Sequence, residues 1–273
     1  MKPEILEKIE YYKQLGHVVP KLSSIKTEEQ IEGIRRSGVI NTGVLDYVAS
    51  RIREGVTTQD IDDWVAEYTE GHGAICADLN YEGYPKHVCV SIDDVVCHGI
   101  PSTREVLREG MIVNVDVSTI LDGYFSDASR MFIIGETTRE KKRLVEVTKQ
   151  CLDIGAQQIK PYGFIGDIGY AIEQHANRNG YKVVREFGGH GVGLQFHEEP
   201  WVGHYGKKNT GMLMVPGMVF TIEPMINMRK SGIRISALDG WTVYTKDRLP
   251  SAQWEHTFLV TEDGFEILTY EEI

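Results

Sequence analysis

The chain of 273 residues has no long run of apolar side chains. No stretch approaches the roughly 18 consecutive apolar residues that a membrane-spanning helix requires, so no membrane partner is expected. The first residues, Met1 to Lys8, alternate charged and aliphatic side chains and lack the apolar core of a secretory signal peptide. Both absences favour a cytoplasmic protein.

Cysteine is scarce and positive charge is in deficit. The four cysteines include no C-x-x-C pair, the spacing of thiol redox and zinc-ribbon sites, which favours reduced thiols. Lysine and arginine number 29 against 40 aspartates and glutamates, giving a formal net charge of −11. An acidic surface repels phosphate backbones and anionic lipid, so specific binding to nucleic acid or to an anionic membrane face is not expected.

The order of expected elements runs helices, strands, helices, strands. The composition, 41% hydrophobic and 25% charged, is that of a globular protein able to bury a substantial core. Capping-box and turn residues predict helices over 4–15, from Thr27, from Thr58, over 138–160 and over 167–179, a hairpin over 111–134, and strands near 88–92, 219–223, 241–245 and 252–260. This order predicts an α+β fold with two related halves, and disfavours a doubly wound parallel sheet.

Two aspartates interrupt the apolar strands of the expected hairpin. With a two-residue turn at Asp122-Gly123, Asp127 lies opposite Ser118 and Asp116 lies opposite Ser129. Both aspartates then project from one face as diagonal neighbours. Carboxylates aimed at one point repel each other, and either a shared proton or a bound cation relieves that repulsion.

Two glutamates show the same anomaly, Glu223 in Met218–Pro224 and Glu255 in Trp254–Val260. Any one of the four acids can be a solvated residue on an exposed strand face. The set favours a common cause, because an unpaired buried carboxylate costs several kcal/mol. His190, between glycines that allow close approach, adds an imidazole to an oxygen-rich set that suits two divalent ions such as Mn, Fe or Co.

The glycine-rich segment also has a competing interpretation as a phosphate-binding loop. However, Gly189–Gly193 does not match G-x-G-x-x-G, and the residues that follow, Leu194–Pro200, are a poor helix start. A dinucleotide loop should open a helix within a βαβ unit, so the nucleotide interpretation is disfavoured.

Eight stretches, in this order, resemble the type I methionine aminopeptidases. They are Gly83–Lys86, Val96–Pro101, Asn114–Val117, Asp127, Gly188–Gly193, Phe220–Pro224, Asp239–Thr242 and Ser251–Thr257. The resemblance implies the pita-bread fold, whose two α/β halves are related by pseudo-twofold symmetry. It also implies an enzyme that releases the initiator methionine from nascent proteins by attack of a metal-activated hydroxide on the first peptide bond.

The resemblance also implies a ligand set and catalytic residues. One metal would be held by Asp127, His190, Glu223 and Glu255, and the other by Asp116, Asp127 and Glu255. The implied catalytic residues are His98 beside the substrate amide, His197 at the substrate carbonyl, and Glu223 as the group that accepts and returns a proton.

The methionine side chain would enter a pocket of residues that otherwise read as core: Tyr81, Tyr84, Cys89, Phe196 and Trp241. An unbranched thioether packs well against aromatic rings and sulfur. A monovalent cation is implied near Asp93, Val95 and Ser251, although position 93 is Asp here where the family has Asn.

The match begins near residue 27, which makes residues 1–26 an N-terminal helical extension and residues 27–273 the catalytic metallopeptidase domain. Glu223 and Glu255 are only 32 positions apart, which disfavours the type II enzymes with their helical insertion and favours a bacterial-like enzyme. The implied partners are nascent polypeptides with N-terminal methionine, with association with the ribosome, and the implied state is a monomer.

Two alternatives stay open. A prolidase or Xaa-Pro aminopeptidase shares the fold and ligand pattern, although these enzymes carry a large N-terminal domain with no room before residue 27. A non-catalytic peptide- or protein-binding relative would have lost ligands, whereas none is missing here.

Overall fold

A computed structural model of the protein describes residues 2–269. The described part contains five α-helices: α1 (Pro3–Gln14), α2 (Glu28–Ala49), α3 (Thr58–Gly71), α4 (Arg139–Ala156) and α5 (Ile165–Arg178). The expected capping box at Thr27 is present and begins α2, and a second capping box, at Thr57, begins α3. No helix within residues 2–269 combines the length and the apolarity needed to cross a bilayer.

Fifteen short strands form four sheets in the described chain. The first contains β1 (Ile75–Cys76), β4 (Ile112–Leu121), β2 (Cys89–Ile92) and β5 (Tyr124–Ile133). The largest has the order β15 (Phe265–Ile267), β14 (His256–Val260), β9 (Val219–Ile222), β7 (Gly189–Gly191) and β8 (Glu198–Val202). The third has the order β13 (Ser251–Gln253), β10 (Met225–Asn227) and β6 (Lys182–Val183). The fourth has the order β11 (Ile233–Ile235), β12 (Val243–Thr245) and β3 (Val95–Cys97).

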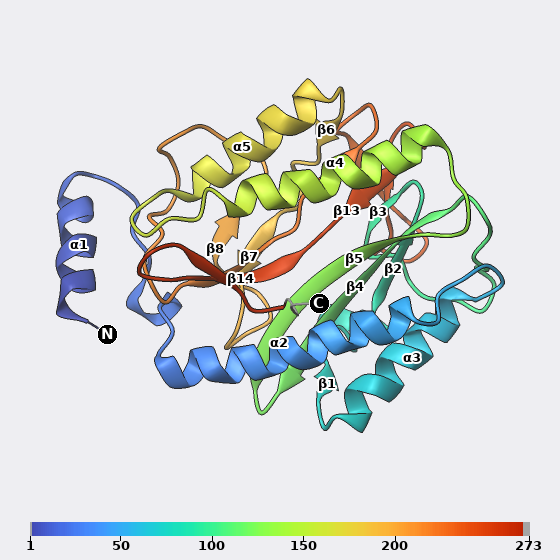
Figure 1. The fold of residues 1–273 in the computed structure, drawn as a ribbon, viewed down its shortest axis with the longest axis horizontal. Coiled ribbons are helices and arrows are strands. Elements are labelled where there is room, and N and C mark those ends of the chain that lie inside the picture. The colour runs from blue at the N-terminus through green and yellow to red at the C-terminus, as the bar shows by residue number, and fades with distance from the viewer. Residues whose placement is uncertain (1, 270–273) are drawn as a thin grey trace.

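Helices cover the strands from two opposite sides, α2 and α3 from one and α4 and α5 from the other (Figure 1). Each pair of helices has its own apolar core. The first core includes Val44, Ile61, Val90 and Val115. The second includes Leu144, Ile168, Phe220 and Phe258. Because every ladder between these strands is antiparallel, the predicted α+β class is confirmed.

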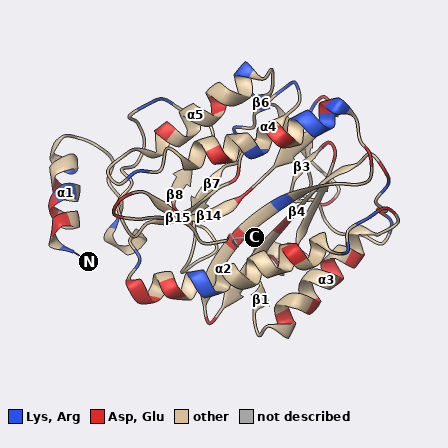
Figure 2. Cartoon of the chain, in the orientation of Figure 1, with Lys and Arg blue, Asp and Glu red and all other residues tan. Residues whose placement is uncertain are grey.

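We call the part covered by α2 and α3 the first half and the part covered by α4 and α5 the second half. The surplus of acidic residues is visible on α2 and α3 (Figure 2). Helix α3 carries acidic side chains and no lysine or arginine. The first turn of α2 holds Glu28 and Glu29, where the positive end of the helix dipole stabilises them.

The β4–β5 hairpin has the predicted register. Asp122 and Gly123 both have positive φ, 51° and 85°, as the type I′ turn requires. Asp116 pairs with Ser129, and Ser118 pairs with Asp127. The hairpin therefore presents both aspartates on the face that the sequence indicated.

One continuous strand over 252–260 is a wrong prediction. The chain leaves the ladder at Trp254 and Glu255 between β13 and β14, and the opposite strand breaks in the same place, at Glu223-Pro224 between β9 and β10. Pro224, which has no N–H to donate to the ladder, falls opposite Trp254 at the break, and Glu255 forms a bridge with Ser129 of β5. The register is the same on both sides of the break, so Glu223 falls opposite Glu255.

Helix α1 lies at the edge of the molecule, away from the other four helices (Figure 1). Pro3 occupies its first turn, and its buried side chains are Ile5 and Ile9, which join the core of the second half. Tyr12 stacks on Tyr162 with ring centroids 6.5 Å apart. Apolar and aromatic contacts therefore hold this helix against the rest of the chain.

Candidate metal centre and active site

A cavity of about 590 Å³ is lined by residues from both halves of the chain. All twelve residues predicted for the metal site, the catalytic groups and the side-chain pocket line it: Tyr81, Tyr84, Cys89, His98, Asp116, Asp127, His190, Phe196, His197, Glu223, Trp241 and Glu255. The prediction did not include the remaining lining residues: Asp78, Glu82, Ser118, Phe187, Gly188, Glu198, Glu199, Trp201 and Met225.

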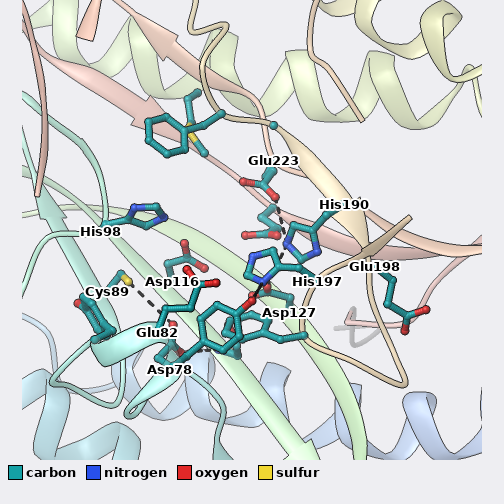
Figure 3. A pocket seen from close by; sticks show the side chains of 18 of the residues that line it. Asp78, Glu82, Cys89, His98, Asp116, Asp127, His190, His197, Glu198 and Glu223 are labelled. Atoms are coloured by element: carbon teal, nitrogen blue, oxygen red, sulfur yellow. Dashed lines mark hydrogen bonds and ion pairs between the residues drawn. The ribbon is translucent and has the colours of Figure 1, made fainter. Parts of the chain in front are cut away.

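The predicted metal ligands lie near one another in the cavity, and Figure 3 labels Asp116, Asp127, His190 and Glu223. One ligand atom from each of Asp127, His190 and Glu255 lies within 4.8 Å of the others. The Nε2 atom of His190 is 3.7 Å from Oδ2 of Asp127 and 3.6 Å from Oε1 of Glu223. These separations leave room for a cation between the side chains and are too long for direct hydrogen bonds.

Ser129 of β5 lies between two of the predicted ligands. On one side Ser129 faces Asp116 of β4. On the other side its N–H donates to the carbonyl of Glu255 at 3.3 Å, and the N–H of Glu255 donates back at 3.2 Å. A residue of the second half thus joins the edge of the β4–β5 hairpin, which brings Asp116 and Glu255 together.

Burial shifts the protonation of every ligand in the absence of a cation. It raises the pKa of Asp127, Glu223 and Glu255 well above their usual range, and the neighbouring carboxylates add to the rise. Desolvation raises the pKa of Asp116 to about 7, while hydrogen bonds from Glu255 and Gln253 oppose the rise. A cation bound between these four acids would oppose the rise in their pKa values and favour their ionised forms.

The surroundings of His190 favour its neutral form, which is the form that binds a metal. Burial, followed by the nearby His197, lowers the pKa of His190 to about 3. Its Nδ1 lies 3.0 Å from the carbonyl of Gly191 and donates to it, which leaves the Nε2 lone pair facing the carboxylates. Oε1 of Glu255 is buried without a hydrogen-bond partner among residues 2–269. A lone pair and an orphaned carboxylate oxygen both fit a bound divalent cation.

The glycines on either side of His190 allow the neighbouring strands to lie very close to the backbone of β7. A Cβ atom on Gly189 would lie 2.3 Å from the carbonyl oxygen of Thr221, and one on Gly191 would lie 2.2 Å from that of Glu199. Only glycine lets β7 pass between its neighbours at this distance. The motif around His190 is thus a packing requirement of the strand that carries the imidazole.

Three further polar residues support the ligands, and the prediction did not include them. Ser118 donates from Oγ to Oδ1 of Asp127 at 2.9 Å. Thr221 donates to Oε1 of Glu223 at 3.0 Å, and buried His204 accepts from the N–H of Glu223 at 3.0 Å. Ser118 could have been found from the hairpin register, because it faces Asp127 directly.

The two other predicted catalytic histidines lie on either side of Asp116 in Figure 3. His98 is held at a φ of 56°, a strained left-handed conformation for this residue type, and burial lowers its pKa to about 4. His197 is exposed to the cavity, its Nδ1 2.9 Å from the hydroxyl of Tyr81 and its ring centroid 4.1 Å from that of His190.

The five predicted pocket residues form an aromatic and sulfur-lined wall beside the carboxylates. The rings of Tyr84 and Trp241 meet edge to face at 5.2 Å, and those of Tyr81 and Phe196 lie 4.7 Å apart. Tyr84 is fixed because its hydroxyl donates to the carbonyl of Gly99 at 2.8 Å.

Asp78 is the acid that the prediction missed in this wall. Its side chain is buried, 3.9 Å from Sγ of Cys89, and it accepts from the N–H of Ser118 at 3.3 Å. Burial, together with the charge of Asp116, raises the pKa of Asp78 well above its usual range. The signal was available, because Asp78 is an acid next to an apolar stretch, as the four ligand acids are.

Two of the residues predicted for a monovalent cation lie together. The carbonyl of Asp93, a residue at a φ of 49°, accepts from the N–H of Ser251 at 2.8 Å. Its carboxylate pairs with Nζ of Lys141 at 2.6 Å. Val95 is nearby in the sequence on β3, and the cation itself stays a prediction.

Known proteins are similar to this chain in sequence. The sequence profile of metallopeptidase family M24 matches residues 32–262. Methionine aminopeptidase A of Synechocystis is 48% identical over 248 residues, which are 90% of this chain and 97% of that protein. The chain belongs to the methionine aminopeptidases of family M24. The resemblance seen in the sequence motifs is confirmed, and with it the predicted enzyme class, a metal-dependent peptidase.

Solved structures of the family confirm the pita-bread fold. The methionine aminopeptidase of Rickettsia prowazekii superimposes with a TM-score of 0.89 at 44% identity, covering 90% of this chain and 99% of that one. The prolidase of Pyrococcus furiosus has a TM-score of 0.74 at 24% identity, and the match covers 66% of its chain. The prolidase therefore shares the fold, while the identity places this chain with the methionine aminopeptidases.

We expect divalent metal to stabilise this methionine aminopeptidase more at about pH 7.5 than at about pH 5.5. The acids with raised pKa hold protons at low pH, and metal must displace those protons. Free metal at 100 times its dissociation constant adds about 2.7 kcal/mol to the free energy of unfolding. Thermal unfolding of metal-free protein, with and without added Mn²⁺ at both pH values, measures the effect.

His190→Ala is the control for that measurement, since it removes the neutral ligand and should abolish most of the metal-dependent shift at either pH. A shift in the unfolding midpoint that is larger at about pH 5.5 than at about pH 7.5 would contradict this account of the site.

Proposed function

We propose that this chain removes the N-terminal methionine from peptides and newly made proteins. The main support is a cavity in which carboxylates and one neutral imidazole lie directly beside a wall of aromatic rings and a thiol. That juxtaposition puts the bond-cleaving groups next to a pocket suited to an unbranched thioether.

The metal ligands are Asp116, Asp127, His190, Glu223 and Glu255, and the oxygen-rich donor set suits two ions of Mn, Fe or Co. Divalent ions held there supply a nucleophilic water at neutral pH and polarise the carbonyl of the first peptide bond.

Glu223 moves the proton in this proposal. It accepts a proton from the attacking water and later delivers it to the leaving amine. Two contacts support this role, since Thr221 holds one carboxylate oxygen and His204 holds the backbone N–H. A fixed carboxylate at the end of β9 is well suited to transfer a proton over a short distance.

His197 stabilises the negative charge that develops on the carbonyl oxygen. The hydroxyl of Tyr81 lies 2.9 Å from Nδ1 of His197. In the proposed arrangement the hydroxyl donates to Nδ1, so that the ring proton is on Nε2 and can be donated to that oxygen. His98 binds the substrate amide and orients the peptide. Tyr81, Tyr84, Cys89, Phe196 and Trp241 receive the methionine side chain.

The remaining features of the proposal concern the setting of the enzyme. Residues 27–273 form the catalytic domain, and residues 1–26 form an extension attached through α1. A monomer in the cytoplasm acts on nascent chains as they leave the ribosome. A monovalent cation binds near Asp93, Val95 and Ser251.

The test of this function is hydrolysis of Met-Ala-Ser by metal-free protein to which Mn²⁺, Fe²⁺ or Co²⁺ is returned. We expect release of methionine, and no comparable hydrolysis of Ala-Pro, the substrate class of a prolidase. His190→Ala should show no metal-dependent turnover. Equal rates on the two substrates, or full turnover by the His190→Ala protein, would contradict the proposal.

Glu223→Gln should lower kcat for Met-Ala-Ser by about 10²–10⁴-fold, because the amide cannot accept the proton. Since Glu223 is also a proposed ligand, the rate is compared at equal bound metal, measured by elemental analysis. Unchanged kcat at equal metal content would exclude Glu223 as the proton carrier.

Trp241→Ala should lower kcat/KM for Met-Ala-Ser by about 10–100-fold, because an aromatic wall of the pocket is lost. Metal content should not change, since the ring contacts of Trp241 within residues 2–269 are with Tyr84 and His98, which are not proposed ligands. Trp64→Ala on α3, outside the cavity, is the matched control and should affect stability alone. A similar loss of kcat/KM in both proteins would remove Trp241 from the pocket.

A further inference from the structure

Lys26 lies just before α2, outside the residues that match the family profile. We propose that Lys26 is a positioning residue for His197: its ammonium group holds Glu198, and Glu198 holds the loop that carries His197. This inference rests on the proposed function, in which His197 contacts the substrate.

The lysine is anchored at both ends. Its N–H donates to the carbonyl of Gly217 at 2.8 Å, and the adjacent Ile25 forms a bridge with Met218. Its Nζ lies 2.6 Å from Oε2 of Glu198, with the two side chains only 1% and 13% exposed. The pair is therefore shielded from water, unlike most surface ion pairs.

Glu198 uses its other oxygen to close the loop. Oε1 accepts from the N–H of Leu194 at 2.7 Å and from the N–H of Gln195 at 3.0 Å. The two residues between these amides and Glu198 are Phe196 and His197, both of which line the cavity. One carboxylate thus binds the lysine with one oxygen and fixes the start of the His197 loop with the other.

Aromatic packing holds the middle of the loop, since Phe196 is buried against Tyr81 and Phe125, while the start of the loop depends on hydrogen bonds. Leu194, Gln195 and His197 are exposed, and the hydrogen bond that the described chain gives the His197 ring is the one with Tyr81. Without its countercharge, the shielded Glu198 carboxylate would turn toward water and release both amides. His197 would then lose its fixed distance to the reacting carbonyl, since small displacements of a catalytic group cost large factors in rate.

The next residue provides a natural comparison. Glu199 also pairs with a lysine of the N-terminal segment, Lys21, at 3.1 Å, but these side chains are 49% and 72% exposed. Exposed pairs of this kind contribute little. The pair formed by Glu199 and Lys21 is therefore the matched control for the pair formed by Glu198 and Lys26.

The first experiment compares kcat/KM for Met-Ala-Ser in four metal-loaded proteins that differ from the wild type by Lys26→Met, Lys21→Met, His197→Ala, and His197→Ala with Lys26→Met. We expect Lys26→Met to lower kcat/KM about 10–100-fold at unchanged metal content, and Lys21→Met to change it by less than about twofold. In the His197→Ala background, Lys26→Met should have less than about a twofold effect, because both changes remove the same interaction.

An equal loss from Lys26→Met with and without His197, or no loss in the wild-type background, would overturn the proposal. If the wild-type protein itself does not hydrolyse Met-Ala-Ser, the proposed function fails, and the loop is then judged by a measurement independent of activity.

That second measurement is amide hydrogen exchange of the segment 193–199. Lys26→Met should speed exchange in this segment and leave the β4–β5 hairpin unchanged. Unchanged exchange at 193–199, or exchange that rises equally in the hairpin because the whole protein is destabilised, would count against a local positioning role.

Discussion

Four carboxylates and one neutral imidazole lie together where two interrupted strands pass the edge of a hairpin. Asp116 and Asp127 belong to the β4–β5 hairpin, Glu223 and Glu255 lie at the breaks in the two strands, and His190 belongs to β7. Burial makes each acid resist ionisation in the presence of the others. A cation bound among these acids would favour their ionised forms, which burial alone opposes.

The fold supplies the rigidity that this arrangement needs. Two separate apolar cores, one under α2 and α3 and one under α4 and α5, fix the strands from opposite sides. The ligands sit where the halves meet, and the ladder between Ser129 and Glu255 joins the halves at that point. The aromatic wall extends from the same place, so that metal site and side-chain pocket share one frame.

Local rules predicted much of this site. The turn at Asp122-Gly123 determined the hairpin register, and the register aligned Asp116 with Asp127. Acids in apolar strands marked Glu223 and Glu255. The same rule should have marked Asp78, whose carboxyl lies buried against Cys89.

Other features depend on contacts that no local pattern records. Pro224 in the opposite strand is a local signal for the break at Trp254, but nothing local marks the pairing of Glu255 with Ser129 of β5, which are far apart in the sequence. The pair of Lys26 and Glu198 joins residues that are 172 positions apart, each within a charged stretch of ordinary appearance.

The bridge between Ser129 and Glu255 bears on how the enzyme is made. Four of the five proposed ligands precede residue 224, while Glu255 follows in a separate segment that must pair with Ser129. During translation, the complete ligand set cannot assemble before Glu255 has been synthesised and has reached the hairpin. Full metal loading thus requires a chain in which the two halves have already joined.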